Sequence, residues 1–309
     1  MNSKNKFKLT IPILYLAFNR LDTVKKTFPK IRKARPKELY ISVDGPRNKK
    51  EKSKTDKVRK YILDNIDWSC DVKTKFPGKN LGCEVAVSHA LDWYFKNVEM
   101  GIVLEDDCLP SDSFFRYCQE LLIKYKDDER ITSIYGTTPV RLEGKVSYAF
   151  TGTIGLWGWA SWARAWNKIY RSEEKYMGNL GPKKYLKEVF PNMVERINFS
   201  KKYMDFINSK VNTWEFPWQL GIIRSKGLNV IPKVNLIENI GVDVGFTNTV
   251  PNPTDKKFLI IKRDEIKFPL KHPKQIRKSN MLRLKFVYRD YKRILIKRFI
   301  SLFEKNNIN

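Results

Sequence analysis

The chain has 309 residues, of which 42% are hydrophobic and 13% aromatic, so it can bury a core as one large domain or two small ones and is not a disordered chain. Its 60 Lys and Arg against 33 Asp and Glu give a formal net charge of +27, which attracts phosphate groups on a nucleotide, a nucleic acid or a membrane surface. With 2 His, 4 Cys and no C-x-x-C pair, the composition argues against a histidine-rich zinc site, a zinc ribbon and a thioredoxin-type motif.

Strand-like and helix-like segments alternate over the first third of the chain. The continuous apolar run 11–17 predicts a strand buried on both faces. Further strands are predicted at 38–43, 70–76 and 101–104, and helices at 21–33, 56–66 and 82–95. This order predicts an α/β fold with a mainly parallel central sheet and flanking helices.

Polar clusters follow three of these predicted strands. They are Asn19-Arg20, Asp44-Gly45 and Glu105-Asp106-Asp107. In open α/β sheets, ligands bind beyond the carboxyl ends of the strands. The coincidence of three clusters at such ends predicts a binding site at this edge of the sheet.

The second half is less regular and rich in tryptophan. We predict helices at 111–125, 182–190 and 203–209 and strands at 131–135, 228–231 and 235–240. Prolines and lysines dominate after residue 250, so 251–278 is interpreted as a linker.

The tail 279–309 has the pattern of a basic amphipathic helix. Leu284, Val287, Tyr291 and Leu295 recur at three- and four-residue spacing between many lysines and arginines. Such a helix either docks its apolar stripe on the domain or lies on an anionic membrane, and the density of basic residues favours the membrane. No apolar run approaches the roughly 20 residues that span a bilayer. We therefore expect a cytoplasmic protein, with peripheral attachment to the inner face of the cell membrane as a further possibility.

The acidic triplet 105–107 carries the strongest chemical signal. Adjacent carboxylates repel one another unless a cation or several hydrogen bonds compensate them. Hard cations such as Mg²⁺ or Mn²⁺ prefer carboxylate oxygens together with substrate phosphates. At a strand end, the triplet therefore favours metal binding over a solvated acidic surface.

The sequence resembles bacterial GT-A glycosyltransferases. It is similar to a family-2-like group that is related in pattern to the N-acetylglucosaminyltransferase I type. The matching segments are Phe18-Asn19-Arg20, Ser42-Val43-Asp44-Gly45-Pro46-Arg47, Asn80-Leu81-Gly82-Cys83, Leu104-Glu105-Asp106-Asp107-Cys108-Leu109-Pro110, Trp157-Gly158-Trp159-Ala160-Ser161-Trp162, Trp214-Glu215 and Asn239-Ile240-Gly241. The resemblance implies a GT-A-like domain over 1–250. Its nucleotide-sugar-binding half would be 1–110, and its acceptor and catalytic half 111–250.

For the acidic triplet, the resemblance implies one role per carboxylate. Asp107 would coordinate an Mn²⁺ or Mg²⁺ ion that bridges the two phosphates of the donor. Asp106 would meet the ribose or the water shell of the metal, and Glu105 the donor sugar.

The resemblance also implies a nucleotide pocket. Asn19 and Arg20 would line it, and Asp44 would bind the base or the ribose, with Gly45 permitting close backbone approach. The loop with Asn80 and Gly82 opens a helix whose amino end would help to hold the nucleotide. The alternative for Asp44-Gly45-Pro46 is an ordinary turn.

Glu215 is the candidate catalytic base. An inverting transfer needs a carboxylate that takes the proton of the acceptor hydroxyl. Trp214 and Trp218 flank Glu215 closely in the sequence, and apolar surroundings raise the pKa of a carboxyl group. The alternative is a structural glutamate at the start of a helix.

Three tryptophans and one asparagine complete the candidate set. Trp157, Trp159 and Trp162 are core residues or sugar-binding residues, and we expect one or two of them, with Trp157 and Trp159 as candidates, to reach the donor. Where related sequences carry a histidine late in the domain, this chain has Asn248, a poorer metal ligand.

The sequence thus predicts a metal-dependent glycosyltransferase that uses a nucleotide-sugar donor, UDP-linked by preference, and a glycan or lipid-linked acceptor. A pseudoenzyme that binds a nucleotide sugar or a glycan without transfer is the alternative. A basic nucleic-acid-binding protein is a weaker one, and no nucleic-acid partner is expected, because no RRM, KH, OB or helix-turn-helix signature accompanies the charge.

Overall fold

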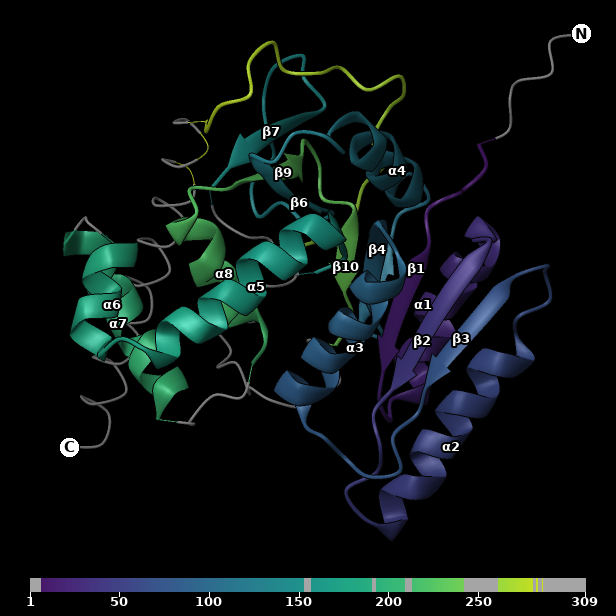
Figure 1. The fold of residues 1–309 in the computed structure, drawn as a ribbon. Coiled ribbons are helices and arrows are strands. Elements are labelled where there is room, and N and C mark those ends of the chain that lie inside the picture. The colour runs from purple at the N-terminus through teal and green to yellow at the C-terminus, as the bar shows by residue number, and fades with distance from the viewer. Residues whose placement is uncertain are drawn as a thin grey trace, which may run out of the picture.

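The computed structural model describes residues 7–152, 157–190, 193–208, 213–241 and 261–279, with residues 282 and 285. They form a mixed α/β fold (Figure 1). The strands are β1 Ile13–Ala17, β2 Glu38–Val43, β3 Asp71–Lys75, β4 Met100–Glu105, β5 Cys108–Pro110, β6 Ile131–Tyr135, β7 Tyr148–Thr151, β8 Trp159–Trp162, β9 Leu228–Pro232 and β10 Ile237–Asn239. The helices are α1 Leu21–Ala34, α2 Lys49–Asp64, α3 Cys83–Asn97, α4 Phe114–Lys124, α5 Ala163–Gly178, α6 Pro182–Val189, α7 Met193–Ile207 and α8 Glu215–Arg224.

Eight strands form one central sheet in the order β3-β2-β1-β4-β8-β6-β9-β7. The half formed by β3, β2, β1 and β4 is parallel throughout. Strand β8 runs antiparallel to both β4 and β6, so the second half of the sheet is mixed. The predicted α/β class with a helix-flanked central sheet is confirmed, and the parallel arrangement holds for the first half.

Two hydrophobic clusters cover the two faces of the sheet. Along β1, Ile13 and Tyr15 belong to one cluster and Leu14 and Leu16 to the other, because alternate side chains of a strand point to opposite faces. Helices α1, α2 and α4 contribute to the first cluster, and α3, α5 and α8 to the second. A third cluster joins α6, α7 and α8, and Figure 1 shows the α6–α7 pair at the opposite end of the molecule from α2.

A separate two-stranded sheet follows the end of β4. Strands β5 and β10 pair antiparallel, with Cys108 opposite Asn239. The amide of Ile240 donates to the carbonyl of Asp107 at 2.9 Å. This small sheet therefore fixes the backbone immediately after the acidic triplet.

The predicted linker 251–278 is a packed strap in its described part. Ile266 and Leu270 are buried in the first cluster. The carboxylate of Glu265 accepts hydrogen bonds from the amides of Asp112 and Ser113, at 2.9 and 2.8 Å, just before α4 begins. Residues 261–278, predicted as part of a linker, therefore pack against the domain in the structure.

The tail predicted as a basic amphipathic helix, 279–309, lies outside the described residues except for three. Among these, Leu282 is buried in the second cluster, and Lys285 Nζ contacts Glu143 Oε1 at 2.9 Å. Within the described part of the chain, every helix is too short or too polar to cross a bilayer.

Several elements of the second half were not predicted. Strands β5, β7 and β8 lay in segments without a clear period, and α7 begins ten residues before the predicted start at 203. Helix α5 was missed although Trp166, Ile169 and Tyr170 recur at helical spacing and are buried. Strand β8 is buried on both faces between β4 and β6, so no apolar–polar alternation marks it.

Candidate active site

The acidic triplet lies at the carboxyl edge of the parallel half of the sheet. Glu105 is the last residue of β4, and Asp106 and Asp107 form the turn into β5. Asp106 is 3% exposed and Asp107 9% exposed. Both carboxylates are thus largely withdrawn from water, where an uncompensated negative charge is costly.

Arg20 compensates part of this charge. It directly precedes α1, and its Nη2 atom donates to Asp106 Oδ1 and to Asp107 Oδ2, the latter at 2.9 Å. Burial raises the pKa of Asp106 to about 6, and the charge of Arg20 opposes that rise. The two carboxylates of the turn are therefore held by a single guanidinium.

Gly241 closes this ion-paired group from the side of β10. A Cβ atom added to Gly241 would lie 2.6 Å from Asp107 Oδ2 and 3.0 Å from Arg20 Nη1. The Gly241 amide donates to Asn239 Oδ1 at 2.9 Å, which holds the backbone in this position. The segment Asn239-Ile240-Gly241, to which the sequence assigned no role, therefore packs against the acidic triplet.

Glu215 begins α8 and faces the same acidic group. Its amide donates to Thr213 Oγ1 at 3.3 Å. Burial, and then the charge of Asp107, raise the pKa of Glu215 to about 7. Burial, Asp107 and Glu215 also raise the pKa of Glu105 well above its usual value. Mutual electrostatic effects of this kind require that the three carboxyl groups lie close to one another.

Aromatic residues surround the start of α8, but most of them are core. Trp159 stacks on Trp214 with ring centroids 5.6 Å apart and planes at 20°. The indole N–H of Trp218 donates to the Tyr135 hydroxyl at 3.3 Å. Trp159, Trp162, Trp214 and Trp218 are all buried, whereas Trp157 is only half-buried. Of the two tryptophans predicted to contact the donor, Trp157 therefore keeps accessible surface and Trp159 does not.

Asp44 holds two loops together. Its carboxylate accepts hydrogen bonds from Asn80 Nδ2 at 2.7 Å and from the amides of Leu81 and Gly82 at 3.0 and 3.2 Å. Burial raises the pKa of Asp44, although these backbone amides oppose the rise. The carboxylate thus occupies the amino end of α3, where the sequence predicted a nucleotide.

Gly45 and Gly82 are each required by the backbone. A Cβ atom on Gly45 would come within 2.3 Å of the Lys79 backbone, so the predicted close approach is to this loop. Gly82 has a φ of 80°, a conformation that other residues rarely adopt. These residues join Asp44 and Asn80 in one group, here called the Asp44 group.

Asn19 belongs to a neighbouring polar contact. Its Nδ2 atom donates to Glu51 Oε1 at 3.2 Å, and Arg47 Nε donates to the same carboxylate at 3.0 Å. The Arg47 guanidinium also lies 5.5 Å from the centroid of the Phe18 ring. Asn19 and Arg20, adjacent in sequence, therefore serve different partners.

The carboxylate oxygens of Asp106 and Asp107 suit a hard divalent cation only if a bound ligand supplies further oxygens. Within the described residues, no three His, Cys, Asp or Glu side chains are arranged to hold a metal ion. Among the described residues, Asp106 Oδ2 is nevertheless buried without a hydrogen-bond partner. Asp107 Oδ2 accepts from Arg20, and Asp107 Oδ1 accepts from the Cys108 thiol at 3.6 Å. Mg²⁺ binds through one or two carboxylates plus phosphates and waters, which matches these two side chains. Asn248 lies outside the described residues.

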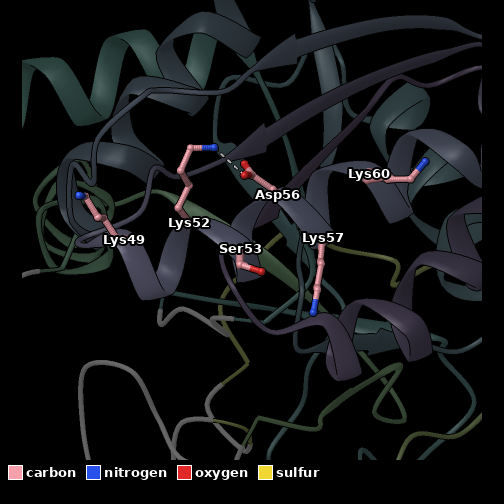
Figure 2. A pocket seen from close by; sticks show the side chains of 6 residues that line it. All are labelled: Lys49, Lys52, Ser53, Asp56, Lys57 and Lys60. Atoms are coloured by element: carbon pink, nitrogen blue, oxygen red, sulfur yellow. Dashed lines mark hydrogen bonds and ion pairs between the residues drawn. The ribbon is translucent and has the colours of Figure 1, made fainter.

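Two hollows lie elsewhere on the surface. One of about 430 Å³ follows the outer side of α2 and is lined by Lys49, Lys52, Ser53, Asp56, Lys57 and Lys60 (Figure 2). Lys52 and Asp56 pair at 2.7 Å, and the other lysines give this helix face a positive charge. The second, of about 520 Å³, is lined by residues at the starts of β6 and β9, including Arg130 and Lys226, at the sheet edge opposite to the acidic triplet.

The sequence did not single out Tyr135 or Gly241. Tyr135 ends β6 next to β8, and only the sheet order brings its hydroxyl to α8. Gly241 was part of a recognised segment, and its position directly after the predicted strand 235–240 was the available signal.

No family model matches the sequence, and no curated protein matches it. Solved structures are similar over part of the fold. TarS 1-349 of S. aureus has a TM-score of 0.36 and 10% identity, over 53% of this chain and 49% of that one. HddC from Yersinia pseudotuberculosis has 0.29 and 12%, over 46% and 60%. The 4-diphosphocytidyl-2C-methyl-D-erythritol synthase from Anaerococcus prevotii has 0.34 and 10%, over 55% and 76%. The chain spans about half of TarS 1-349, and similarities this weak carry no argument about activity.

Proposed function

We propose that this chain is a metal-dependent glycosyltransferase with a GT-A-like fold. It moves a sugar from a nucleotide-diphosphate donor, UDP-linked by preference, to a hydroxyl of a glycan or lipid-linked acceptor, with inversion at the anomeric carbon. The observation that carries the proposal is the convergence of Glu215 on the acidic triplet, from an element more than a hundred residues away in the sequence.

Glu215 is the general base of the proposed reaction. A base works best when its pKa lies near the working pH, because it is then ionised and still basic enough to take a proton. Burial and Asp107 raise the pKa of Glu215 to about 7, which meets this condition. Its carboxylate takes the proton of the acceptor hydroxyl as that oxygen attacks the anomeric carbon.

The triplet and the neighbouring loops bind the donor. Asp107 holds the divalent cation, with Asp106 on the ribose or on the water shell of the cation, and Glu105 contacts the donor sugar. A divalent cation at this place, Mn²⁺ or Mg²⁺, offsets the charge that grows on the leaving diphosphate.

The Asp44 group shapes the nucleotide pocket. Because the Asp44 carboxylate is engaged by the loop before α3, we assign it to holding that loop in place. Asn19, Asn80 and the half-buried Trp157 supply polar and aromatic surface for the nucleotide and the sugar.

The acceptor side is proposed from charge. The net charge of +27 and the lysine face of α2 attract phosphate-bearing acceptors and anionic membranes. The basic tail 279–309 is the proposed membrane contact, and the protein would then act at the inner face of the cell membrane.

A nucleotide-sugar-binding protein without transferase activity is the second candidate. It is favoured by the buried ring of Trp159 and by the engagement of both turn carboxylates with Arg20. Donor binding without turnover would identify this case.

A thermal-shift panel with UDP, GDP, dTDP and CMP sugars, each with and without Mn²⁺, tests the proposed function. Binding at a hundred times the dissociation constant stabilises the fold by about 2.7 kcal/mol. We expect one nucleotide class to raise the melting temperature, and only with the cation. If no nucleotide sugar shifts the melting temperature under either condition, the donor-binding proposal is wrong.

A further inference from the structure

Arg20 is the positive charge that the acidic triplet already holds. Its Nη2 atom is shared between Asp106 Oδ1 and Asp107 Oδ2. The guanidinium side chain is 20% exposed and the Asp106 side chain 4% exposed, so the pairing is screened only weakly by water. A divalent cation that approaches Asp107 therefore meets a competing cation on the same oxygen.

The pairing leaves part of the site unsatisfied. Within the described residues, Asp106 Oδ2 is buried and makes no hydrogen bond of ordinary geometry, and leaving such an acceptor unpaired costs free energy. The Asp107 side chain is 13% exposed, so an incoming ligand can reach it. The site thus holds a counter-ion and still has a buried acceptor for a further positive or hydrogen-donating group.

The charge balance indicates when a metal ion can enter. The three groups in direct contact, Asp106, Asp107 and Arg20, together carry one net negative charge when both aspartates are ionised. A divalent cation added alone would reverse the sign of this largely buried group, whereas a cation that arrives with a diphosphate brings opposite charge with it. The guanidinium displaced from Asp107 would then have a phosphate to bind, a pairing that arginine favours.

We infer that Arg20 is an exchangeable counter-ion that makes metal binding at Asp107 depend on the nucleotide diphosphate. Without donor, Arg20 occupies Asp107 and opposes binding of the free cation. With donor, the cation takes Asp107 and Arg20 turns to the diphosphate. The inference rests on the proposed function, since it takes a nucleotide diphosphate as the ligand.

The test compares wild type with Arg20→Gln in two titrations. In the first, Mn²⁺ alone is titrated and followed by electron paramagnetic resonance, and we expect Arg20→Gln to bind it at least about tenfold more tightly, because the competing charge is gone. In the second, UDP is titrated by calorimetry at saturating Mn²⁺, and we expect at least about tenfold weaker binding by the variant, because the diphosphate loses its arginine. A merely structural arginine would move both affinities in the same direction.

Arg130→Gln is the control, because Arg130 also pairs with an aspartate, Asp128, but is more exposed and lies at the opposite sheet edge, and it should change neither titration. Arg20→Lys keeps the charge and should give a Mn²⁺ affinity between wild type and Arg20→Gln. It is the deciding variant if Arg20→Gln does not fold.

Equal or weaker binding of Mn²⁺ alone by folded Arg20→Gln would overturn the inference, as would the absence of measurable Mn²⁺ binding by both proteins. If only Arg20→Lys folds, a Mn²⁺ affinity equal to that of wild type counts against it. Failure of wild type to bind UDP with Mn²⁺ would instead remove the proposed function, while the Mn²⁺-alone comparison still decides the role of Arg20.

Discussion

Four carboxyl groups meet at the acidic edge, and their surroundings divide them into two kinds. Asp106 and Asp107 share the Arg20 guanidinium, whose charge opposes the rise that burial causes in the pKa of Asp106. Glu105 and Glu215 have raised pKa values from burial and from the negative charge of Asp107. The pair that already holds a cation, Arg20, is therefore suited to bind cations, and Glu215, with a pKa of about 7, is suited to exchange protons, as a metal-assisted transfer with a general base requires.

The first prediction concerns Glu215→Gln. The replacement is nearly isosteric, so donor binding should persist, but an amide cannot accept the acceptor's proton. Loss of a general base typically slows a reaction by about 10²- to 10⁴-fold, and we expect a fall in kcat of that order. Glu129→Gln, at an exposed glutamate paired with Lys168, is the control. Turnover within a few-fold of wild type would show that Glu215 is not the base.

The second prediction follows from the pKa of Glu215. Because this pKa is raised from 4.5 to about 7, the folded protein keeps a proton that the unfolded chain releases between these values. The contribution of Glu215 to the free energy of unfolding should therefore fall as the pH rises through this window. Glu215→Gln lacks this dependence, so its melting temperature relative to wild type should increase from pH 4.5 to about 7 and then level off.

The turnover rate of the wild type should rise with pH, whereas the contribution of Glu215 to the free energy of unfolding falls. The base must be ionised, so kcat of the wild type should rise with a midpoint near pH 7. If the difference in melting temperature between Glu215→Gln and wild type does not vary over this pH range, the pKa of Glu215 is not raised to about 7.

The sequence predicted which residues lie together better than it predicted the contacts that they make. Asp44, Asn80 and Gly82 were expected to hold a nucleotide, and they do lie together, but they bind one another. Whether a polar side chain faces a ligand or a neighbouring loop depends on backbone amides whose directions no residue pattern records. Trp159, a candidate for contact with the donor or for the core, is buried because three aromatic neighbours on other elements cover its ring, which no local pattern records.

At the scale of elements, the β5–β10 sheet determines the position of the triplet. It binds the backbone on the far side of Asp107, while β4 holds the near side in the main sheet. The turn is therefore fixed at both ends, which pre-organises its carboxylates.

The third prediction tests this brace through Gly241→Ala. The added Cβ would lie 2.6 Å from Asp107 Oδ2 and displace the Arg20 pair. Forced overpacking typically costs about 1–3 kcal/mol, and we expect a loss of stability in this range together with weaker binding of UDP and Mn²⁺. Gly181→Ala, where nothing lies within 4 Å of the new atom, should bind normally. Wild-type affinity in Gly241→Ala would mean that β10 does not constrain the site.

Most elements with a clear period were predicted, α5 being the exception, and those defined by tertiary contacts were not. Strand β1 and helix α1 show in the sequence because continuous apolar residues or a helical stripe pack against a core. Strand β8 and the strap 261–279 have no such local pattern. Strand β8 is ordered by pairing with β4 and β6. The strap is ordered in part by the hydrogen bonds that the amides of Asp112 and Ser113, just before α4, donate to Glu265.

At the scale of the whole molecule, the proposed active site is acidic whereas the chain as a whole is strongly basic. The acidic groups gather at one sheet edge, whereas lysines line the outer side of α2 (Figure 2). A formal charge of +27 around a local acidic site draws in anions and reserves the site itself for a cation and the anion bound to it.

The fourth prediction concerns the basic tail. Deleting residues 286–309 spares Leu282, which is buried, and the contact of Lys285 with Glu143. We expect the shortened protein to keep its melting temperature and UDP affinity but to lose binding to anionic phosphatidylglycerol vesicles in co-sedimentation. Each basic residue near such a surface contributes about 1 kcal/mol.

The control for the tail is full-length protein with Lys49→Glu and Lys57→Glu on α2, which should still sediment with the vesicles. If the α2 variant is released and the shortened protein is not, the lysine face of α2 is the membrane contact. Unfolding of the shortened protein would place the tail in the core.

The central claim is that Asp107 binds a divalent cation together with a nucleotide diphosphate. Calorimetric titration of UDP in the presence of Mn²⁺, for wild type and Asp107→Ala, tests it most directly. The change removes a carboxylate at the edge of the site and little core volume, so the variant should fold. We predict clear binding by wild type that depends on Mn²⁺, and none by Asp107→Ala. Equal affinity in the two proteins, or wild-type binding that is indifferent to the cation, would contradict the account.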